Sequence, residues 1–435
     1  MARGHLLRVL GVGFGLAVLI GNTIGAGILR APGEVAAHLP SVPLFLAAWL
    51  VGGIYALLGA IQVAELGAML PRSGGQYVFA RHAFGDYAGF VVGWSDWLST
   101  CGSAAAVSIV IGEFVGALWP ALAPHAVATA VAVALLFALA QWRGVKEGSG
   151  VQLVTSLLKA AAFLALIAAA FVLGGDGGDA PVRPRGEETL AVAFLLSLQA
   201  VIYTYDGWTG PVYFSEEIRA VGRNVPRAMI GGVLAVIALY LLVNVAFLYA
   251  VPLSAFAGSS FAAGLVAGIL FGPRGDALLR GLTILSMLSA VNAYHLMASR
   301  TLFALSRDGL FSRRGAAVNV GGTPTSALLL SVAVALLFIL FGRTFEQVIT
   351  LLAFFFVANY TMSFAAVFVL RRREPERERP YRAWGYPWTT AAALAGSVAF
   401  LVAAIAADTA NSVYALVLLG MSYPLYRFTR AREGI

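Results

Sequence analysis

The sequence has few charged residues. Asp, Glu, Lys and Arg make up 11% of its 435 residues, whereas a soluble globular domain carries about 25%. Hydrophobic residues account for 60% of the chain, and its mean hydropathy is +0.84. This composition excludes an ordinary soluble protein and predicts an integral membrane protein built from apolar helices.

Cysteine and the common catalytic motifs are also scarce. Cys101 is the single cysteine, so an intrachain disulfide is impossible, and we interpret Cys101 as a small packing residue. The sequence contains no HExxH, paired cysteines, P-loop or nucleophile elbow. We therefore expect no catalytic residues, no metal, no other cofactor and no ATP-driven step, which argues against an enzyme.

Long polar stretches are missing as well, so we expect one transmembrane domain over 1–435. The two longest are 174–188, rich in Gly, Pro and Asp, and 371–382, which mixes both charge signs. The first is typical of a flexible loop. The second is expected to solvate the membrane face, with contact to lipid headgroups as the alternative.

Apolar segments long enough to cross a bilayer follow one another along the chain. A helical span needs about 20 residues, and the sequence predicts twelve, whereas 260–271 is too short and is expected to form a helix in an outer loop. The predicted spans are 7–30, 42–69, 86–117, 123–142, 151–174, 189–215, 225–251, 276–306, 324–342, 346–371, 384–408 and 410–428. The basic start resembles a signal peptide but lacks a clear cleavage site, so we expect it to remain as the first span.

The distribution of basic residues predicts the orientation. The net charge of +8 does not indicate a nucleic-acid partner, because the basic residues fall on alternate loops. With the N-terminus in the cytoplasm, 22 of the 29 Lys and Arg residues are cytoplasmic. This asymmetry predicts a multi-pass protein of the cell (inner or plasma) membrane with both termini in the cytoplasm.

Two of the predicted spans are interrupted. The first contains "GNTIGAG" at 21–27, and the sixth contains "YDGWTGP" at 205–211. Matching interruptions five spans apart predict an inverted repeat, with 7–174 and 189–371 as the two halves and 384–428 appended, and a substrate site at the breaks. The alternative for Gly21 and Gly25 is close helix packing; we favour unwinding there and accept packing for Gly11 and Gly15.

Several motifs together resemble the amino acid–polyamine–organocation (APC) superfamily, and within it the bacterial relatives of the L-type amino acid transporters. They are "IGAGILRAP", "AELGAMLPRSGGQYVFARHAFG", "YDGW" with "EEIRAVGRNVPRA", and "SRTLFALSRDGLF" followed by "TP". The resemblance covers nearly the whole chain. It implies an all-α protein of 12 transmembrane helices with the LeuT fold, a 5+5 inverted repeat in which helices 1 and 6 are broken.

The resemblance also implies a site for an α-amino acid. The backbone amides of Gly25, Ala26 and Gly27 would bind the carboxylate at a helix N-terminus, although Ala26 replaces the serine common in the family. Carbonyls of Thr23, Tyr203 and Asp206 would accept from the ammonium, and Tyr203 matches a gating aromatic. Ile24 and Thr209 complete the predicted substrate-binding set.

Lys159 is an ionisable residue inside the fifth predicted span. Such residues usually face the bundle interior and carry function, although a lysine can also reach the interface. L-type relatives carry a lysine at this point, where its ammonium replaces a sodium ion. We expect the Gly21 carbonyl and the Ser286 or Ser289 hydroxyl to solvate it, either as a fixed strut or as a proton carrier.

Other buried polar residues receive structural interpretations. We expect Glu65 and Glu217 to pair with Arg-rich segments. Interhelical hydrogen bonds are expected for Asp96, Asn244, Asn292, His295 and Asn359. Whether Asp206 or His295 moves a proton stays open.

The sequence thus predicts a secondary transporter that moves amino acids, neutral L-amino acids in particular, by alternating access and without sodium. A proton-coupled symporter, a polyamine or organic-cation transporter and an amino-acid-binding membrane sensor remain alternatives. Expected partners are an amino acid and membrane lipids. The loop "WPALAPHA" at 119–126 contains no cysteine, so we expect no disulfide-linked heavy subunit. The identity of the amino acid, the coupling mode and the oligomeric state stay open.

Overall fold

The computed structural model describes residues 8, 10–143, 145–175, 189–341, 345–407 and 409–433. Within these ranges the regular elements are helices, and β-structure is limited to two isolated bridges. The predicted all-α class is confirmed.

The helices follow the predicted spans closely. The first twelve helical elements are α1 (Val12–Thr23), α2 (Ala26–His38), α3 (Val42–Met69), α4 (Gln76–Phe84), α5 (Asp86–Leu118), η1 (Pro120–His125), α6 (Ala126–Arg143), α7 (Val145–Leu173), α8 (Leu190–Tyr205), η2 (Gly210–Phe214), α9 (Val221–Ala250) and α10 (Leu253–Phe256). The remainder are α11 (Ala262–Phe271), η3 (Gly272–Arg274), α12 (Gly275–Arg307), η4 (Arg313–Ala316), α13 (Thr325–Phe341), α14 (Phe345–Arg373), α15 (Trp388–Ala407), α16 (Thr409–Gly420) and α17 (Ser422–Glu433).

Nine helices in the described part of the chain are long and apolar enough to cross a membrane, or ten when α1 and α2 count as one bent span. The helix α13 has 17 residues and falls just short of that length. The prediction of one helix over 410–428 was wrong, because the helix is interrupted at Met421, between α16 and α17. Gly420 and Pro424 flank this break, and both residue types disfavour a continuous helix.

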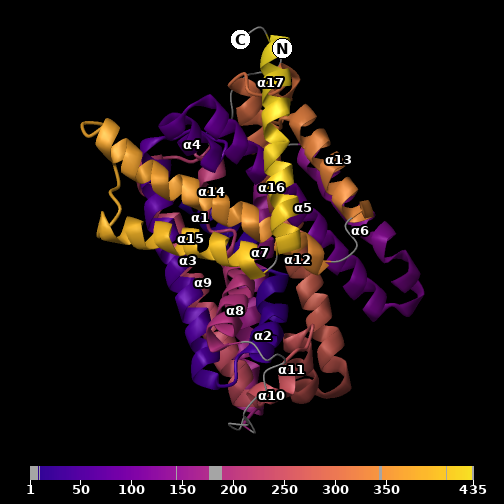
Figure 1. Ribbon diagram of the computed structural model, residues 1–435. Helices are drawn as coiled ribbons and strands as arrows, with labels where there is room; N and C mark the ends of the chain where they lie inside the picture. The colour runs from indigo at the N-terminus through magenta and orange to yellow at the C-terminus, as the bar shows by residue number, and fades with distance from the viewer. Residues whose placement is uncertain are drawn as a thin grey trace.

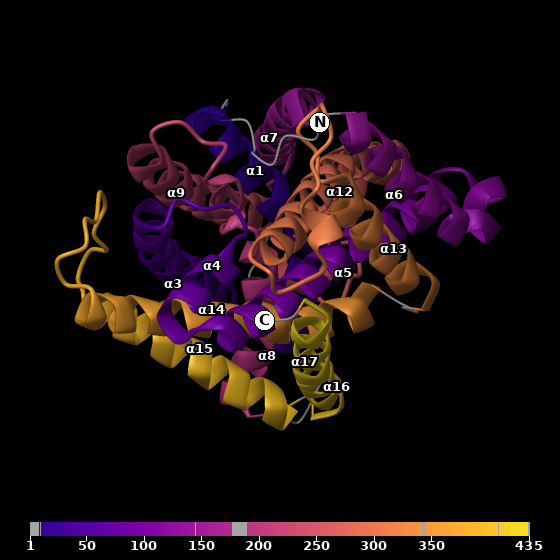
Figure 2. The same ribbon diagram turned by 90° about the horizontal axis from the view of Figure 1, so that it is seen from above.

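The long helices α5 and α12 form the centre of the bundle. They pack against each other, and α5 also contacts α6, α13 and α14. Figure 1 marks both chain ends on the same side of the bundle, opposite α10 and α11. Seen from above in Figure 2, α14 and α15 lie side by side along one flank. The predicted short helix at 260–271 is present as α11, a helix of 10 residues.

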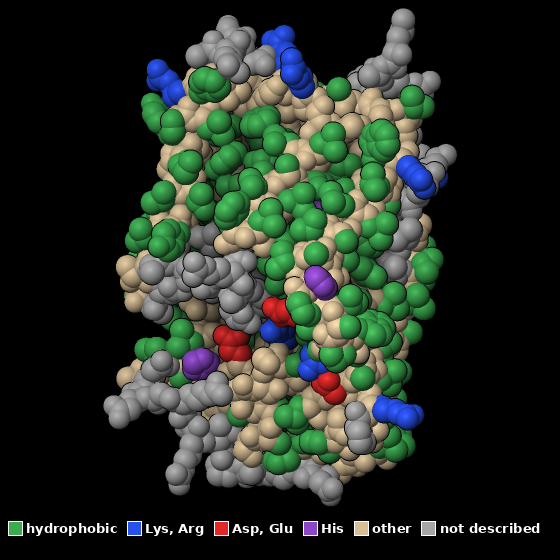
Figure 3. Space-filling view, turned by 90° about the vertical axis from the view of Figure 1, so that its right-hand side faces the viewer, with side chains coloured by type: hydrophobic (Ala, Val, Ile, Leu, Met, Phe, Trp, Pro, Cys, Tyr) green, Lys and Arg blue, Asp and Glu red, His purple; other side chains and the backbone are tan. Residues whose placement is uncertain are grey.

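The outer surface is strongly apolar. Figure 3 shows hydrophobic side chains over much of one face, with Lys and Arg at its upper end and, beside Asp and Glu, in its lower half. Exposed leucines such as Leu139 on α6, Leu157 on α7 and Leu337 on α13 are more than half exposed. A surface of this kind is stable against lipid rather than water, so the chain is a multi-pass membrane protein.

Most of the predicted interhelical hydrogen bonds are present. Tyr213 donates to Asp96 over 2.6 Å, Ser95 donates to Asn359 over 2.7 Å, and His295 lies 3.2 Å from the Ala134 carbonyl. Asn292 donates to Gln152 over 3.2 Å.

Three other polar residues give a mixed outcome. The interpretation of Asn244 was wrong, since its amide donates to Tyr240 of its own helix. Glu65 pairs with Arg371 as expected, whereas the partner of Glu217 is Arg300, which lies inside α12.

Candidate functional site

The first span is broken at the predicted place. The helix α1 ends at Thr23 and α2 begins at Ala26, and their axes are bent by 41°. Ile24 adopts extended dihedrals, and no side chain caps the first amides of α2 at Gly25. The break therefore leaves amide donors at the start of α2 and carbonyl acceptors at the end of α1.

The glycines in this stretch have different roles. A Cβ built on Gly25 would meet no atom within 4 Å, so this residue lies at the break with open space beside it. A Cβ on Gly21 would lie 2.0 Å from Nε2 of Gln152, and one on Gly27 would lie 2.9 Å from Oγ1 of Thr204. Helix packing therefore accounts for Gly21 and Gly27, and our preference for unwinding over packing was wrong for Gly21.

The second break follows α8. Tyr205 ends that helix, Asp206–Thr209 form a turn, and Gly210–Phe214 continue as the 3₁₀ segment η2. The predicted interrupted span over 189–215 is thus present at Leu190–Phe214, and its interruption is a tight turn followed by a 3₁₀ segment. Gly207 has φ of +110°, and a Cβ there would lie 2.9 Å from the Thr23 amide nitrogen. Only glycine lets the two breaks touch in this way.

Tyr240 of α9 joins the two breaks. Its hydroxyl lies 2.6 Å from the Thr23 carbonyl and 3.0 Å from the Thr204 carbonyl. The single hydroxyl proton can satisfy one carbonyl at a time. Tyr240 therefore holds the end of α1 against the end of α8 from outside both helices.

A small cavity lies between the breaks, with a volume of about 20 Å³. This is room for about one water molecule. Its lining includes the predicted site residues Thr23, Gly25, Ala26, Gly27, Tyr203 and Asp206. Binding of an amino acid requires this cavity to widen.

Ile24 and Thr209 take other positions. Ile24 does not line this cavity; its side chain is buried and its carbonyl faces Lys159. Thr209 lines a second cavity of about 10 Å³, which shares Asp206 and Tyr294 with the first. The two small cavities therefore form one polar region divided by these two side chains.

Two carboxylates line the second cavity. Asp206 accepts a short hydrogen bond from Tyr360 of α14, and Asp96 accepts one from Tyr213. The second oxygen of Asp96, Oδ2, has no hydrogen-bond partner among the described residues. The Gly207 backbone amide also donates a hydrogen bond to the Asp206 carboxylate.

Some residues that line the first cavity were missed at the sequence level. They are Asn22, Val107, Thr204, Ala290 and Tyr294. Val107 lies on α5, and Ala290 and Tyr294 lie on α12. Both helices are continuous, so no break in the sequence marks these positions, and only the packing of α5 and α12 beside the breaks identifies them.

Lys159 reaches the first break from α7. Its ammonium donates to the Gly21 carbonyl over 2.9 Å and to the Ile24 carbonyl over 2.5 Å. The side chain is 3% exposed, which excludes the alternative that it reaches the interface. Both acceptors found among the described residues are backbone carbonyls at the end of α1.

The predicted serine ligands lie close to this contact but do not carry it. The Ser286 hydroxyl is 3.5 Å from the Ile24 carbonyl, a weak contact at best. The Ser289 hydroxyl accepts from Gln152 over 3.1 Å instead. Gln152 and Ser156 of α7 also donate to the Ala17 carbonyl. Backbone carbonyls of α1, rather than hydroxyls of α12, therefore solvate the ammonium.

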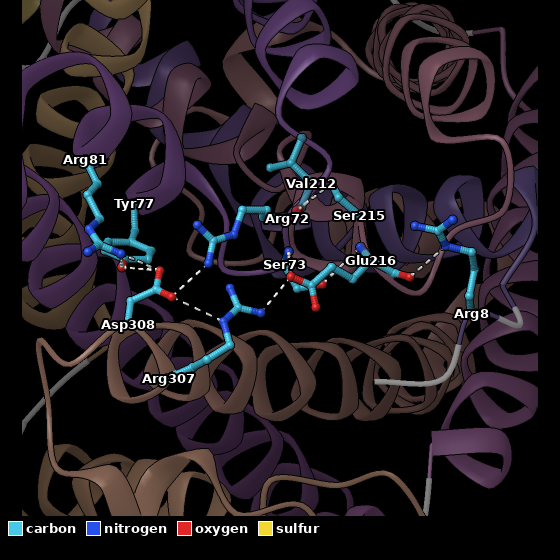
Figure 4. Close-up of polar contacts among 10 residues, drawn as sticks. All are labelled: Arg8, Arg72, Ser73, Tyr77, Arg81, Val212, Ser215, Glu216, Arg307 and Asp308. Atoms are coloured by element: carbon cyan, nitrogen blue, oxygen red, sulfur yellow. Dashed lines mark hydrogen bonds and ion pairs between the residues drawn. The ribbon is translucent and has the colours of Figure 1, made fainter. Parts of the chain in front are cut away.

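An ion-pair cluster closes the bundle at the end that carries both chain termini. Asp308, after α12, lies 2.8 Å from Arg72 and 2.8 Å from Arg81, and Tyr77 donates to it over 2.7 Å. Figure 4 shows that these side chains converge on Asp308 from the α3–α4 connection and α4.

Arg307 extends this cluster to the segment after η2. It lies 2.6 Å from Glu216 and 3.3 Å from Asp308. Glu216 also accepts from the Ser73 amide, and its own carbonyl accepts from Arg8 (Figure 4). These contacts connect the end of α12 to Glu216 after η2 and, through Glu216, to Arg8 before α1.

Contacts close the opposite end as well. Arg30 of α2 donates to the Ser260 carbonyl over 3.0 Å and lies 3.7 Å from Glu113. The Gly33 carbonyl accepts from Gly258, and a Cβ on Gly33 would lie 2.1 Å from the Ser259 carbonyl oxygen. The α10–α11 loop is therefore packed directly on α2. Contacts among the described residues therefore connect the helices at both ends of the bundle.

A polar cavity between two broken spans, with amides on one side and carbonyls on the other, defines the class of a membrane transporter for a small polar solute. The sequence comparisons agree. The family model described as "Amino acid permease" matches residues 10–422, so the chain belongs to the amino acid permease family.

Known relatives refine this assignment. The chain is 28% identical to the serine/threonine exchanger SteT of Bacillus subtilis, over 99% of this chain and 98% of that protein. It is 27% identical to the b(0,+)-type amino acid transporter 1 of mouse, over 87% of this chain and 79% of that protein. It is 29% identical to the mouse Asc-type amino acid transporter 1, over 87% of this chain and 73% of that protein. These relatives are transporters and not enzymes.

Proposed function

We propose that the protein exchanges neutral L-amino acids across the cell membrane by alternating access and without sodium. The observation that carries this proposal is the contact of the Lys159 ammonium with the Gly21 and Ile24 carbonyls at the break in the first span. A fixed cation at this point leaves no need for a bound metal cation. The likeness to a serine/threonine exchanger over nearly the full chain supports the exchange mode.

The substrate carboxylate would bind the uncapped amides of Gly25, Ala26 and Gly27, where the dipole of α2 favours an anion. The ammonium would bind carbonyls of Thr23, Tyr203 and Asp206. In the closed arrangement the Tyr203 carbonyl already accepts from the Asp206 amide over 3.1 Å, but a carbonyl has a second lone pair for the substrate.

The side-chain end of the site favours a small neutral substrate. Val107, Ala290 and Tyr294 line the cavity there and offer apolar surface with one hydroxyl. A charged substrate side chain would need a buried counter-charge. The carboxylates of Asp96 and Asp206 are already held by tyrosine hydroxyls.

Alternating access would move the first, second, sixth and seventh spans, which contain α1, α3, α8 and α9, against the rest. Tyr203 would act as the gate over the substrate. The ion pairs around Asp308 would open to release the amino acid on one side of the membrane. The contacts of Arg30 would open on the other side. This motion fits twelve spans with the inverted repeats 7–174 and 189–371, followed by 384–428.

The orientation proposed from the charge asymmetry places both termini, and the Asp308 cluster, in the cytoplasm. Membrane lipids are the expected surroundings. With Cys101 buried in α5, we propose that the protein works without a disulfide-linked heavy subunit.

Proton-coupled uptake is the second candidate, and one observation favours it. Asp96 and Asp206 line the same cavity, and one Asp96 oxygen lacks a partner among the described residues. A carboxylate placed there could take up a proton beside the substrate path. Lys159 could carry a proton only if its ammonium first gave up its hydrogen bonds to the Gly21 and Ile24 carbonyls and released a proton.

Purified protein in liposomes distinguishes these functions. We expect uptake of radiolabelled serine, threonine or another neutral amino acid to rise severalfold when the same class is loaded inside, and to be unchanged when choline replaces sodium. Uptake driven by an acidic exterior into empty liposomes would favour proton coupling. Binding without uptake would identify a sensor, and uptake of polyamines alone would overturn the substrate class.

A further inference from the structure

A groove of about 850 Å³ lies on the surface between the start of α9 and the connection from α14 to α15. Its walls are formed by one face of α9, with Arg223, Arg227, Gly231 and Leu234, and by Tyr381 and Trp384 of the connection. Figure 2 shows this connection on the flank where α3 and α9 lie. The groove is separate from the two cavities at the helix breaks.

The two arginines provide uncompensated positive charge. Arg223 and Arg227 are four residues apart, so they project from one face of the helix. Neither makes an ion pair or a side-chain hydrogen bond with the described residues. Nearby arginines of the connection differ in this respect, because Arg379 pairs with Glu65 and Arg377 pairs with Glu374.

Below the arginines the groove becomes apolar. Leu234 follows Arg227 by seven residues, which corresponds to about 10 Å along a helix. Leu234 is 49% exposed, and a Cβ on Gly231 would meet no atom within 4 Å. The groove therefore offers a basic upper end and an open apolar channel beneath it.

Aromatic residues mark the level of the membrane interface. Trp384 is 60% exposed, and its ring lies 6.2 Å from that of Tyr381. Tryptophan and tyrosine favour the headgroup level of a bilayer. The Tyr381 hydroxyl is buried without a hydrogen-bond partner among the described residues. Burial, and then the charge of Glu65, raise the pKa of Tyr381 to about 12, so it is a neutral donor.

From this charge complementarity we propose that the groove binds one anionic phospholipid. Its phosphate lies between Arg223 and Arg227, its glycerol ester region lies beside Tyr381 and Trp384, and an acyl chain fills the channel over Gly231 and Leu234. Each basic side chain near an anionic lipid surface strengthens the interaction by roughly fivefold. The lipid would thus connect α9, a helix of the moving group, with the α14–α15 connection.

Trp384 reports directly on the occupant. The chain has eight tryptophans, so the signal of Trp384 is the difference in fluorescence between the protein and its Trp384→Phe variant. In liposomes of phosphatidylcholine we expect a small fraction of phosphatidylglycerol with brominated acyl chains to quench this signal at least tenfold more effectively, per mole, than brominated phosphatidylcholine. Equal quenching by the two lipids would overturn the proposal.

Variants test the two halves of the groove separately. Replacing both arginines, Arg223→Gln with Arg227→Gln, should remove most of the preference for phosphatidylglycerol. The matched control is Arg143→Gln, an exposed arginine that ends α6, and it should keep the preference. If Arg143→Gln reduces it equally, the effect is general surface charge and the groove is not the site.

Gly231→Leu should place a side chain in the channel and reduce quenching by both brominated lipids. Gly281→Leu on α12, where a Cβ also meets no atom within 4 Å, should leave quenching unchanged. Undiminished quenching in Gly231→Leu would contradict occupation by an acyl chain. Relief of quenching by millimolar inorganic phosphate would identify a site for free anions rather than lipid.

Discussion

At the scale of single residues, the break in the first span depends on a few backbone groups rather than on reactive side chains. The Lys159 ammonium satisfies two carbonyls that a continuous helix would have satisfied itself. Gly25 keeps the space next to the free amides open. Two predictions belong to this scale.

Lys159→Ala should reduce exchange at least tenfold while the protein remains folded, because the two carbonyls lose their donor without a change in the packed helices. Initial uptake rates in liposomes, with the melting temperature as a control for folding, measure this effect. If the ammonium replaces a sodium ion, high sodium should partly restore the variant. A strict sodium requirement in the unmodified protein would contradict this role.

Gly25→Leu should abolish substrate binding, because its side chain would extend into the open space at the break. The matched control is Gly13→Leu in α1, where a Cβ also meets no atom within 4 Å. Binding measured by scintillation proximity should be normal in the control. Gly27→Leu is a poorer probe, since Thr204 packs against that position. Normal affinity in Gly25→Leu would show that the site lies elsewhere.

At the scale of elements, the two breaks form one unit. Gly207 lets the turn after α8 touch the Thr23 amide, and Tyr240 bridges the ends of α1 and α8. The aromatic rings of Tyr205 and Tyr240 pack 4.9 Å apart beside them. The broken helices are therefore positioned by α9, which is itself continuous.

Tyr240→Phe should keep the fold and slow exchange several-fold, because the ring still packs while the link between the carbonyls is lost, a hydrogen bond of about 1 kcal/mol. Tyr205→Phe is the matched control, since the Tyr205 hydroxyl has no hydrogen-bond partner among the described residues. Uptake rates should separate the two variants. Equal rates would mean that the Tyr240 hydroxyl does not position the breaks.

At the scale of the whole molecule, contacts at both ends hold the bundle closed over its cavities. Burial alone would raise the pKa of Asp308, but the hydrogen bond from Tyr77 and the charges of Arg307, Arg72 and Arg81 outweigh burial and lower it. A lowered carboxyl pKa means that the stabilising charge is present above the unfolded value of about 3.9 and is lost only in stronger acid. The cluster should therefore stay closed throughout pH 5 to 8.

Asp308→Asn should open the bundle at this end, because three arginines would lose their common counter-charge. In a Cys101→Ala background, a cysteine introduced at Ser103, which lines the second cavity, reports access. Its labelling by an impermeant maleimide in inside-out vesicles should rise several-fold. Asp276→Asn breaks the pair of Asp276 with Arg280 elsewhere and should leave labelling unchanged. Unchanged labelling in Asp308→Asn would remove the cluster as a closing device.

Much of this architecture was predictable because a bilayer restricts the chain so strongly. Helical spans follow from apolar length, since backbone groups in lipid must be satisfied within the chain. The break at Ile24 and Gly25 and the one after Tyr205 were found from glycine and proline in otherwise apolar runs. The division of 410–428 at Met421 was missed, although Gly420 and Pro424 flank it and the chain becomes polar after it.

The sequence by itself determined the class of protein, the helices and the positions of the two breaks, since each depends on local composition and on the solvent around it. Only the tertiary structure decided which groups meet. It brought Lys159 to carbonyls rather than to Ser289, assigned Gly21 and Gly27 to packing, and placed Val107 and Tyr294 in the cavity. Such contacts depend on how distant helices pack, and packing geometry leaves no periodic signal in a single chain.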